Sequence, residues 1–218
     1  MNRTKIEWCT RSLNPVVGCT YGCPYCYARR MNERFGWVKD FSNPQFFPER
    51  LKQLSEKKPQ VIFMDSMSDI ADWERPWLNE TIRAIEANPQ HRYLFLTKRP
   101  ERCADSLRMR PKNVLLGISV TTQKDMMAKF NWFRNGADFL SIEPLLGPIL
   151  PIPKNVKWVI IGAETGPKAV QHQPSRWWVQ EIADACLTAG IPIFMKNSIS
   201  AAWGIPLVRE LPWEADHA

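Results

Sequence analysis

The sequence predicts an α/β fold built as a full or partial (β/α) barrel, with a doubly wound parallel sheet as the alternative. Six short apolar runs, rich in β-branched or aromatic residues, recur along the chain, and each is followed by a polar residue. Continuous runs of this kind are typical of strands buried on both faces, as in a parallel sheet. Helical patterns lie between several of the runs, and strands that alternate with helices indicate right-handed crossover units.

The predicted elements follow one another in a regular order. Strands are expected at residues 61–64, 93–96, 114–118, 139–142, 158–161 and 191–195, with one more near the N-terminus. A helix is predicted over 76–85, where Pro76 suits the first helical position. A second is predicted over 177–187, with Gly190 just past its end, and a weaker pattern covers 123–133. Seven strands are enough for the barrel.

Length and composition indicate one globular domain over residues 1–218. Hydrophobic residues make up 44% of the chain and charged residues 23%, which excludes intrinsic disorder, collagen and coiled coil. No stretch approaches the roughly 20 apolar residues of a membrane span. The first twelve residues also lack the apolar core of a signal peptide. These observations predict a soluble, cytoplasmic protein with no membrane partner.

The positive charge is concentrated in one part of the chain. The net charge is +7, and residues 1–60 hold 11 Lys and Arg against 5 Asp and Glu, a net +6. A basic region of this kind attracts polyanions such as nucleic acids. A solvated basic surface that aids solubility is the alternative, and charge alone does not separate the two.

Three of the six cysteines, Cys19, Cys23 and Cys26, crowd into eight residues with the spacing C-x3-C-x2-C. Crowded cysteines without a secretion signal bind metal or do redox chemistry more often than they form disulfides. Three thiolates are one ligand short of closing a tetrahedral zinc site or a four-iron cluster. In a [4Fe–4S] cluster they leave one iron open for another ligand. Zinc and unligated thiols remain the alternatives.

Polar residues follow the predicted strands, where the chemistry of parallel barrels is found. They are Asp65, Ser66, Lys98, Ser119, Glu143, Glu164 and Lys196. Their spread over six strand ends predicts the lining of one site. The alternative for each residue is that polar side chains follow strands because loops are hydrated.

The cysteine motif resembles the signature of the radical SAM superfamily, C-x3-C-x-aromatic-C, with Tyr25 at the aromatic position. The resemblance implies a partial (β/α)6-type TIM barrel of the radical SAM kind. It further implies that Cys19, Cys23 and Cys26 hold a [4Fe–4S] cluster whose open iron binds S-adenosyl-L-methionine. An external electron donor would then drive cleavage to a 5′-deoxyadenosyl radical. Tyr25 would pack near the adenine.

A narrower resemblance covers nearly the whole chain. The matching segments are 4–8, 14–16, 26–28, 66–69, 96–100, 143–147 and 162–167. They resemble a phage-associated, three-cysteine family of formerly unknown function, some members of which are linked to thymine hypermodification in DNA as radical isomerases. The resemblance implies one radical SAM domain over 1–218, with the cluster loop at 18–28 and a C-terminal extension at about 197–218. It also implies that the protein is located in the cytoplasm of an infected bacterial host. Many relatives have a longer gap between the first two cysteines.

The superfamily resemblance also assigns cofactor contacts. Asp65, Ser66 and Ser68 would accept from the amino group of S-adenosylmethionine. Ser119 and Thr121 would bind the ribose hydroxyls or the carboxylate, and Lys98 would neutralise that carboxylate. The remaining strand-end residues, Glu143, Glu164 and Lys196, are left for catalysis on the substrate or for late cofactor contacts. A supporting or salt-bridging role is the alternative for each residue.

Nucleic-acid contacts are predicted on the helix that follows the cysteine motif. Arg29, Arg30 and Arg34 closely follow Cys26, and they are expected to hold phosphates of DNA or of a modified nucleotide. Trp73 and Trp77 are expected near the mouth of the site. Two other function classes stay open: a radical enzyme on a small metabolite or peptide, and a non-enzymatic, metal-binding nucleic-acid-binding module. The chain is expected to be a monomer.

Overall fold

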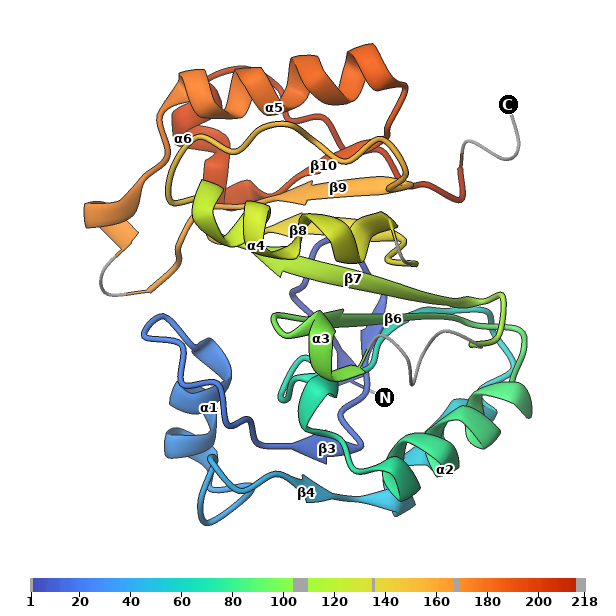
Figure 1. Ribbon diagram of the computed structural model, residues 1–218. Coiled ribbons are helices and arrows are strands. Elements are labelled where there is room, and N and C mark those ends of the chain that lie inside the picture. Colours follow the sequence, from blue (N-terminus) through green and yellow to red (C-terminus); the bar gives the residue numbers. More distant parts are fainter. Residues whose placement is uncertain (1, 104–109, 135, 167–168, 215–218) are drawn as a thin grey trace. The chain divides into compact units, whose positions relative to one another are not determined.

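The computed structural model describes residues 2–103, 110–134, 136–166 and 169–214 (Figure 1). The chain divides into two compact units, residues 1–116 and 117–218, and the boundary falls inside strand β7 (Val114–Val120). Each unit has a hydrophobic core of its own. The expectation of one domain over 1–218 stays a prediction.

The sheet of the first unit has the strand order β1-β2-β5-β6. These strands are β1 (Asn2–Arg3), β2 (Arg11–Ser12), β5 (Val61–Phe63) and β6 (Arg92–Thr97). β1 is antiparallel to β2, whereas β2, β5 and β6 are parallel. A separate antiparallel pair consists of β3 (Val16–Val17) and β4 (Gln45–Phe46). The predicted N-terminal strand is therefore confirmed as β2, although it is only two residues long.

The helices of the first unit are short. They are α1 (Tyr27–Phe35), the 3-10 helices η1 (Pro48–Ser55) and η2 (Ile70–Asp72), α2 (Arg75–Glu86) and α3 (Pro100–Cys103). α2 carries the predicted helix one residue further at each end, and it buries Leu78, Thr81 and Ile85 against the core. This spacing places the three side chains on one helix face.

The second unit is a four-stranded parallel sheet in the order β7-β8-β9-β10. Its other strands are β8 (Phe139–Ile142), β9 (Trp158–Ile161) and β10 (Ile193–Met195). Its helices are α4 (Gln123–Arg134), η4 (Ala169–His172), α5 (Arg176–Ala189), η5 (Asn197–Ile199) and α6 (Ser200–Trp203). Every residue of β8, β9 and β10 is buried, as continuous apolar runs predict for strands covered on both faces.

Helix α5 shows how local sequence sets an element of this unit (Figure 1). The Ser175 side chain caps its first turn by accepting from the backbone N–H of Trp178, and Gly190 ends it in a left-handed conformation at φ 64°. Val179, Ile182 and Cys186 are buried in the same core as the strands. The predicted helix is thus confirmed together with its glycine stop.

Two expectations need correction. The run 191–195 becomes a strand only from Ile193, because Pro192 has no backbone N–H to give to the ladder. Trp73 is not at a site mouth, because it is buried, stands edge-on to Phe95 at 5.6 Å and donates its indole N–H to Ser68. Trp77 stacks on Phe46 at 5.8 Å. Within the described residues, no helix is long and apolar enough to cross a membrane.

Candidate functional site in the cysteine loop and at the strand ends

The cysteine loop, residues 18–28, connects β3 with α1. It carries three free, half-buried thiols, those of Cys19, Cys23 and Cys26. The Cys19 sulfur accepts from the backbone N–H of Tyr21 at 3.4 Å, and the Cys26 sulfur accepts from that of Arg29 at 3.4 Å. The second bond caps the N-terminus of α1. Backbone N–H groups that donate to sulfur stabilise the thiolate form, which is the form that binds metal.

The start of the loop requires glycine. Gly18 has φ 117°, and a Cβ there would lie 2.7 Å from Cα of Pro44. Its backbone N–H donates to the carbonyl of Met67 at 3.0 Å, and it forms a parallel bridge with Ser68. The loop is therefore joined directly to the segment that follows β5.

The donor set of the loop fits an iron–sulfur cluster. Three thiols in eight residues, two of them with N–H···S bonds, match the ligands that such clusters use. A single zinc ion would need ligand sulfurs about 2.3 Å from one centre. No three His, Cys, Asp or Glu side chains in the described segments are gathered closely enough to hold one metal ion. A cluster instead binds each thiolate at a different iron.

Burial shifts the pKa of two thiols of the loop, those of Cys19 and Cys23. Burial raises the pKa of Cys19 to about 12, although the N–H of Tyr21 opposes the shift. Burial also raises the pKa of Cys23, and the charge of Lys98 opposes that shift. Metal binding at these two residues would therefore release protons.

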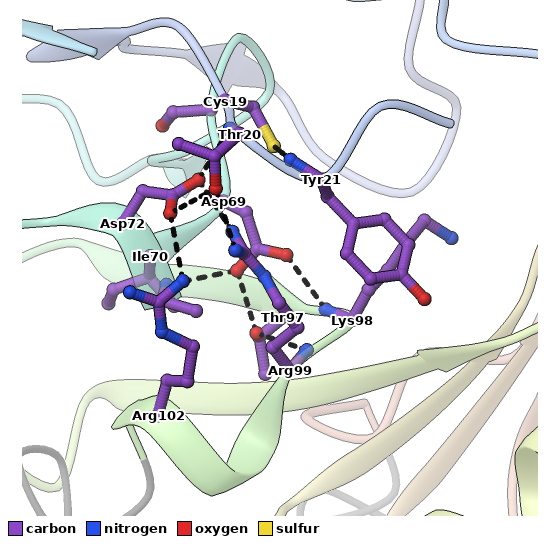
Figure 2. A network of polar contacts seen from close by, with 12 residues as sticks. Cys19, Thr20, Tyr21, Asp69, Ile70, Asp72, Thr97, Lys98, Arg99 and Arg102 are labelled. Atoms are coloured by element: carbon purple, nitrogen blue, oxygen red, sulfur yellow. Dashed lines mark hydrogen bonds and ion pairs between the residues drawn. The ribbon is translucent and has the colours of Figure 1, made fainter. Parts of the chain in front are cut away.

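A buried ion pair holds the first part of the cysteine loop in place (Figure 2). Asp72, at the end of η2, accepts from both the backbone N–H of Thr20 at 2.9 Å and its hydroxyl at 2.8 Å. Arg99 donates to Asp72 at 2.5 Å and to the Thr20 hydroxyl at 2.8 Å. Burial by itself would raise the pKa of Asp72, but the bonds from Arg99 and Thr20 outweigh it and lower that pKa.

Two cations that follow β6, Lys98 and Arg99, face aromatic rings of the loop. The Lys98 Nζ atom lies 5.4 Å from the ring centre of Tyr25, and the Arg99 Cζ atom lies 5.4 Å from that of Tyr21. Asp69 fixes this strand end, because it accepts from the Thr97 hydroxyl at 2.7 Å and from the Lys98 N–H at 3.0 Å. The structure thus brings Tyr25 and Lys98, both predicted from sequence, into direct contact.

The residues predicted to bind the cofactor after β5 have partners within the first unit. Asp65 is buried and accepts from the N–H groups of Ile70 at 3.3 Å and Leu96 at 3.1 Å, so both of its oxygens face backbone donors. The Ser66 hydroxyl donates to Asn14 at 3.0 Å. Ser68 accepts from the indole of Trp73, as described above. Asp65 therefore braces two strand ends, whereas Ser66 and Ser68 are half-buried.

In the second unit, the two predicted cofactor contacts after β7, Ser119 and Thr121, differ in their exposure to solvent. Ser119 is buried, and its carbonyl accepts from the Lys129 ammonium at 2.9 Å. Thr121 is half-buried, and its N–H donates to Asp125 at 3.1 Å.

Glu143 and Lys196, from the ends of β8 and β10, form an ion pair. Their side chains are 28% and 16% exposed, so the pair is partly open to solvent. A Cβ at Gly162, after β9, would lie 3.1 Å from the Lys196 side chain, 3.2 Å from Ser198 and 3.4 Å from Glu143. Glycine at this strand end leaves room for the pair.

Glu164, also after β9, is 8% exposed and lies 2.7 Å from the Nδ1 atom of His172, which belongs to η4. The His172 side chain is 46% exposed. The pair combines a sheltered carboxylate with an accessible imidazole, a combination suited to proton transfer. The structure therefore brings the three predicted catalytic residues into two acid–base pairs within one unit.

The three arginines after the motif do not share one face of α1. Arg29 points toward the protein, where it donates to the carbonyl of Cys19 at 3.5 Å and to Ser42 at 3.3 Å, and covers the Phe41 ring at 5.2 Å. Arg30 and Arg34 are four residues apart and lie on another face. Arg29 thus braces the cysteine loop, and the other two remain candidates for phosphate contacts.

Sequence reasoning missed Asp72, Arg99 and His172. Arg99 and Asp72 are 27 residues apart, and Arg99 is 79 residues from Thr20, so spacing along the chain gave no signal for their contacts. His172 lies in no motif. Lys98 and Arg99 are adjacent in the sequence and follow a predicted strand. This pair of charges at a strand end was the sequence signal that pointed to Arg99.

Solved structures of spore photoproduct lyase share this fold. A double mutant with bound AdoMet and dinucleoside spore photoproduct matches with a TM-score of 0.51 and 13% identity, over 89% of this chain and 57% of that chain. A complex with dinucleoside spore photoproduct matches with a TM-score of 0.52 and 12% identity, over 84% and 62%. The chain thus spans about three fifths of the length of these structures. The fold class is the α/β partial TIM barrel of these structures, as predicted.

The family is shown by the sequence itself. A family model described as "Protein of unknown function (DUF5131)" matches residues 3–204. The chain belongs to this family. A search of curated proteins found no match.

Proposed function

We propose that the chain is a radical SAM enzyme in which Cys19, Cys23 and Cys26 hold a [4Fe–4S] cluster. The observation that carries the proposal is the cysteine loop, with three free thiols and two N–H···S bonds on a partial TIM barrel of the radical SAM kind. With S-adenosylmethionine, such a cluster supplies a 5′-deoxyadenosyl radical when an external donor reduces it. The AdoMet named in one spore photoproduct lyase structure supports the cofactor.

The cofactor contacts stay within this proposal. Tyr25 would pack against the adenine, and Lys98, already beside the Tyr25 ring, would bind the carboxylate of the cofactor. Ser66 and Ser68 belong to the segment that the bridge at Gly18 joins to the loop, and they would accept from the ammonium group of the cofactor. Asp65 would hold that segment in position through the hydrogen bonds that it accepts from backbone N–H groups. Ser119 and Thr121 remain proposed contacts for the ribose or the carboxylate.

We propose a nucleobase substituent, in DNA or in a modified nucleotide, as the substrate. Two observations support this class: the net charge of +6 in residues 1–60 and the dinucleosides held by the spore photoproduct lyase structures. The Glu143–Lys196 and Glu164–His172 pairs would hold or move protons as the substituent is rearranged. An isomerase acting on hypermodified thymine in phage DNA is the specific form of the proposal.

Formation of 5′-deoxyadenosine tests the proposal. Protein reconstituted anaerobically with iron and sulfide is reduced and mixed with S-adenosylmethionine, alone and with modified DNA, unmodified DNA, free nucleosides or peptides. Mass spectrometry then reads 5′-deoxyadenosine and the change in substrate. We expect cleavage in wild type and in Cys9→Ala, none in Cys23→Ala, and a mass-neutral product only with the nucleic acid.

The remaining function classes give different results in the same assay. Turnover on a small metabolite or peptide would retain the radical chemistry and reject the nucleic-acid substrate. DNA binding with no 5′-deoxyadenosine under any condition would indicate a non-enzymatic binding module.

A further inference from the structure

Two aromatic rings stand exposed and stacked at the C-terminal end of α1. Phe35 is 52% exposed and Trp37 is 40% exposed. Their ring centres lie 5.2 Å apart, with an angle of 27° between the ring planes. Large aromatic side chains are usually buried, because burial of the ring is favourable. A stacked pair that remains in solvent is therefore a feature to explain.

The local backbone holds this pair in a fixed geometry. Gly36 ends α1 in a left-handed conformation at φ 65°, so the chain reverses between the two rings. The side chain of the buried residue Asn32 then binds Val38 twice, donating to its carbonyl at 2.9 Å and accepting from its N–H at 3.0 Å. A buried amide thus fastens the turn to the helix, and the rings are presented in one arrangement.

Basic and apolar side chains continue this surface along α1. Tyr27, Met31 and Phe35 are spaced four residues apart, so they lie on one helix face, and all three are exposed. Arg30 and Arg34 follow the same spacing beside them, and the Arg34 Cζ atom lies 5.2 Å from the Phe35 ring centre. We call these residues, together with Trp37, the α1 surface. Rings beside arginines are the combination that binds unpaired nucleic-acid strands.

We propose that the α1 surface binds an unpaired segment of the DNA substrate, with bases stacked on Trp37 and Phe35 and phosphates at Arg30 and Arg34. This inference rests on the proposed function, since it names the form in which that substrate is held. An unpaired strand is required because the bases of a duplex stack on one another and leave no face for a protein ring. The positive charge of the surface matches a phosphate backbone.

The position of the surface sets its distance from the cysteine loop. Cys26 is the N-cap of α1, and the helix has 9 residues, so its far end lies about 13 Å along the axis at 1.5 Å per residue. At about 3.4 Å per stacked nucleotide, the α1 surface binds bases up to roughly four positions from a nucleotide held at the loop. We therefore expect the α1 surface to bind the nucleotides next to the reacting base.

Fluorescence anisotropy tests the α1 surface. The probes are a labelled, mixed-sequence single strand about 12 nucleotides long and the duplex of the same sequence, each titrated with the full chain over a range of salt. Trp37→Ala is expected to weaken binding of the single strand roughly 5- to 150-fold and to leave the salt dependence unchanged. Changing both Arg30 and Arg34 to Gln is expected to flatten the log–log salt slope by about 1.4.

Trp177→Ala is the matched control, because Trp177 is 58% exposed on α5 in the other unit. It should bind the strand as wild type does. Equal binding of strand and duplex, or unchanged binding by Trp37→Ala, would overturn the inference. Self-association that Trp37→Ala removes while DNA binding stays constant would assign the surface to a second copy and overturn it too.

The outcomes separate this inference from the proposed function. Loss of single-strand binding in Trp37→Ala, in a protein that forms no 5′-deoxyadenosine, supports the surface and rejects the radical enzyme. Wild-type binding by Trp37→Ala, in a protein that does form 5′-deoxyadenosine, rejects the surface and retains the enzyme.

Discussion

The cysteine loop of the first unit and the acid–base pairs of the second unit are held in opposite ways. The loop is fastened to four other segments: through Thr20 to η2 and to Arg99 after β6, through Gly18 to the residues after β5, and through the N–H of Cys19 to the carbonyl of Phe41 at 2.7 Å. The Glu143–Lys196 and Glu164–His172 pairs lie at the ends of β8, β9 and β10 and in η4, and each pair has a side chain that is partly open to solvent. One region is built for fixed geometry, and the other leaves polar groups accessible.

The two regions also differ in how far their charged pairs are buried, and burial sets how strongly each pair affects stability. The side chains of Asp72 and Arg99 are 3% and 10% exposed, whereas that of His172 is 46% exposed. Removal of one partner from a buried pair leaves a charge uncompensated, while partly exposed pairs are screened by water. Under the proposed function, a loop that presents three thiols to a cluster would benefit from the first arrangement, and groups that exchange protons with a substrate would benefit from the second.

The largest expected effect comes from the cysteines themselves. Cys23→Ala removes one of the three proposed thiolate ligands, so the iron content of reconstituted protein is expected to fall from about four irons per chain to nearly none. Iron and sulfide analysis, together with the visible absorption of the cluster, measures the change.

Cys9→Ala is the matched control, because Cys9 is also a half-buried cysteine outside any disulfide but lies outside the loop. It should keep the wild-type iron content. Stoichiometric zinc and no iron in the wild-type protein would contradict the cluster and leave the fold class unchanged.

The next largest effect tests how the loop is fastened. Asp72→Ala leaves the Arg99 guanidinium buried without its counter-charge and removes two acceptors of Thr20. We expect the free energy of unfolding, measured by urea denaturation without metal, to fall by about 3–5 kcal/mol. The variant should also lose its iron faster to a chelator.

Lys157→Ala provides the comparison, since Lys157 pairs with Asp138 at 3.0 Å and its side chain is 67% exposed. It should change the free energy of unfolding by at most about 1 kcal/mol. Equal effects of the two variants would remove the distinction between a rigid and an accessible region.

A third prediction concerns Asp65, a buried carboxyl group that accepts from backbone N–H groups. Burial raises the pKa of Asp65 well above its usual range, and the charge of Asp69 raises it further. The folded state therefore holds a proton that the unfolded state has released. Stability that comes from this proton is present at low pH and is lost as pH rises from about 3.9 toward the raised folded-state pKa.

Asp65→Asn removes the titration and keeps an oxygen that accepts from backbone N–H. Urea denaturation at several pH values should show the stability of wild type falling relative to this variant as pH rises through that window. The Asp72 pKa is lowered, so its contribution has the opposite sign and is lost as pH falls. A constant difference between wild type and Asp65→Asn at all pH values would contradict the prediction.

The sequence predicted the strands well because their signal is local. Continuous apolar runs such as 139–142 and 158–161 became fully buried strands, and Gly190 marked the end of α5. The spacing of the cysteines likewise needs only eight residues. Elements of this kind depend on neighbours in the chain, so a single sequence is enough to place them.

The contacts that fasten the loop depend on distant residues. Asp72 bonds a threonine 52 positions away, and neither residue belongs to a periodic pattern. The different orientations of the three arginines have a related cause: Arg29 packs against Phe41, and the sequence alone did not show which side α1 buries. Local patterns located the loop, and only the packed chain showed what holds it.

The smallest expected effect sharpens the accessible side of the comparison. Gly162→Ala places a methyl group 3.1 Å from the Lys196 side chain and 3.4 Å from Glu143. The distance to Lys196 is shorter than an ordinary van der Waals contact. Because both side chains are partly exposed, they have room to shift by a few tenths of an ångström. We therefore expect a loss of stability of about 1 kcal/mol or less, near the low end of overpacking effects.

Gly147→Ala is the matched control, since a Cβ there meets nothing within 4 Å. Iron content should stay unchanged in both variants, while turnover of substrate should fall only in Gly162→Ala. Equal turnover in the two variants would show that the Glu143–Lys196 geometry does not matter for the reaction.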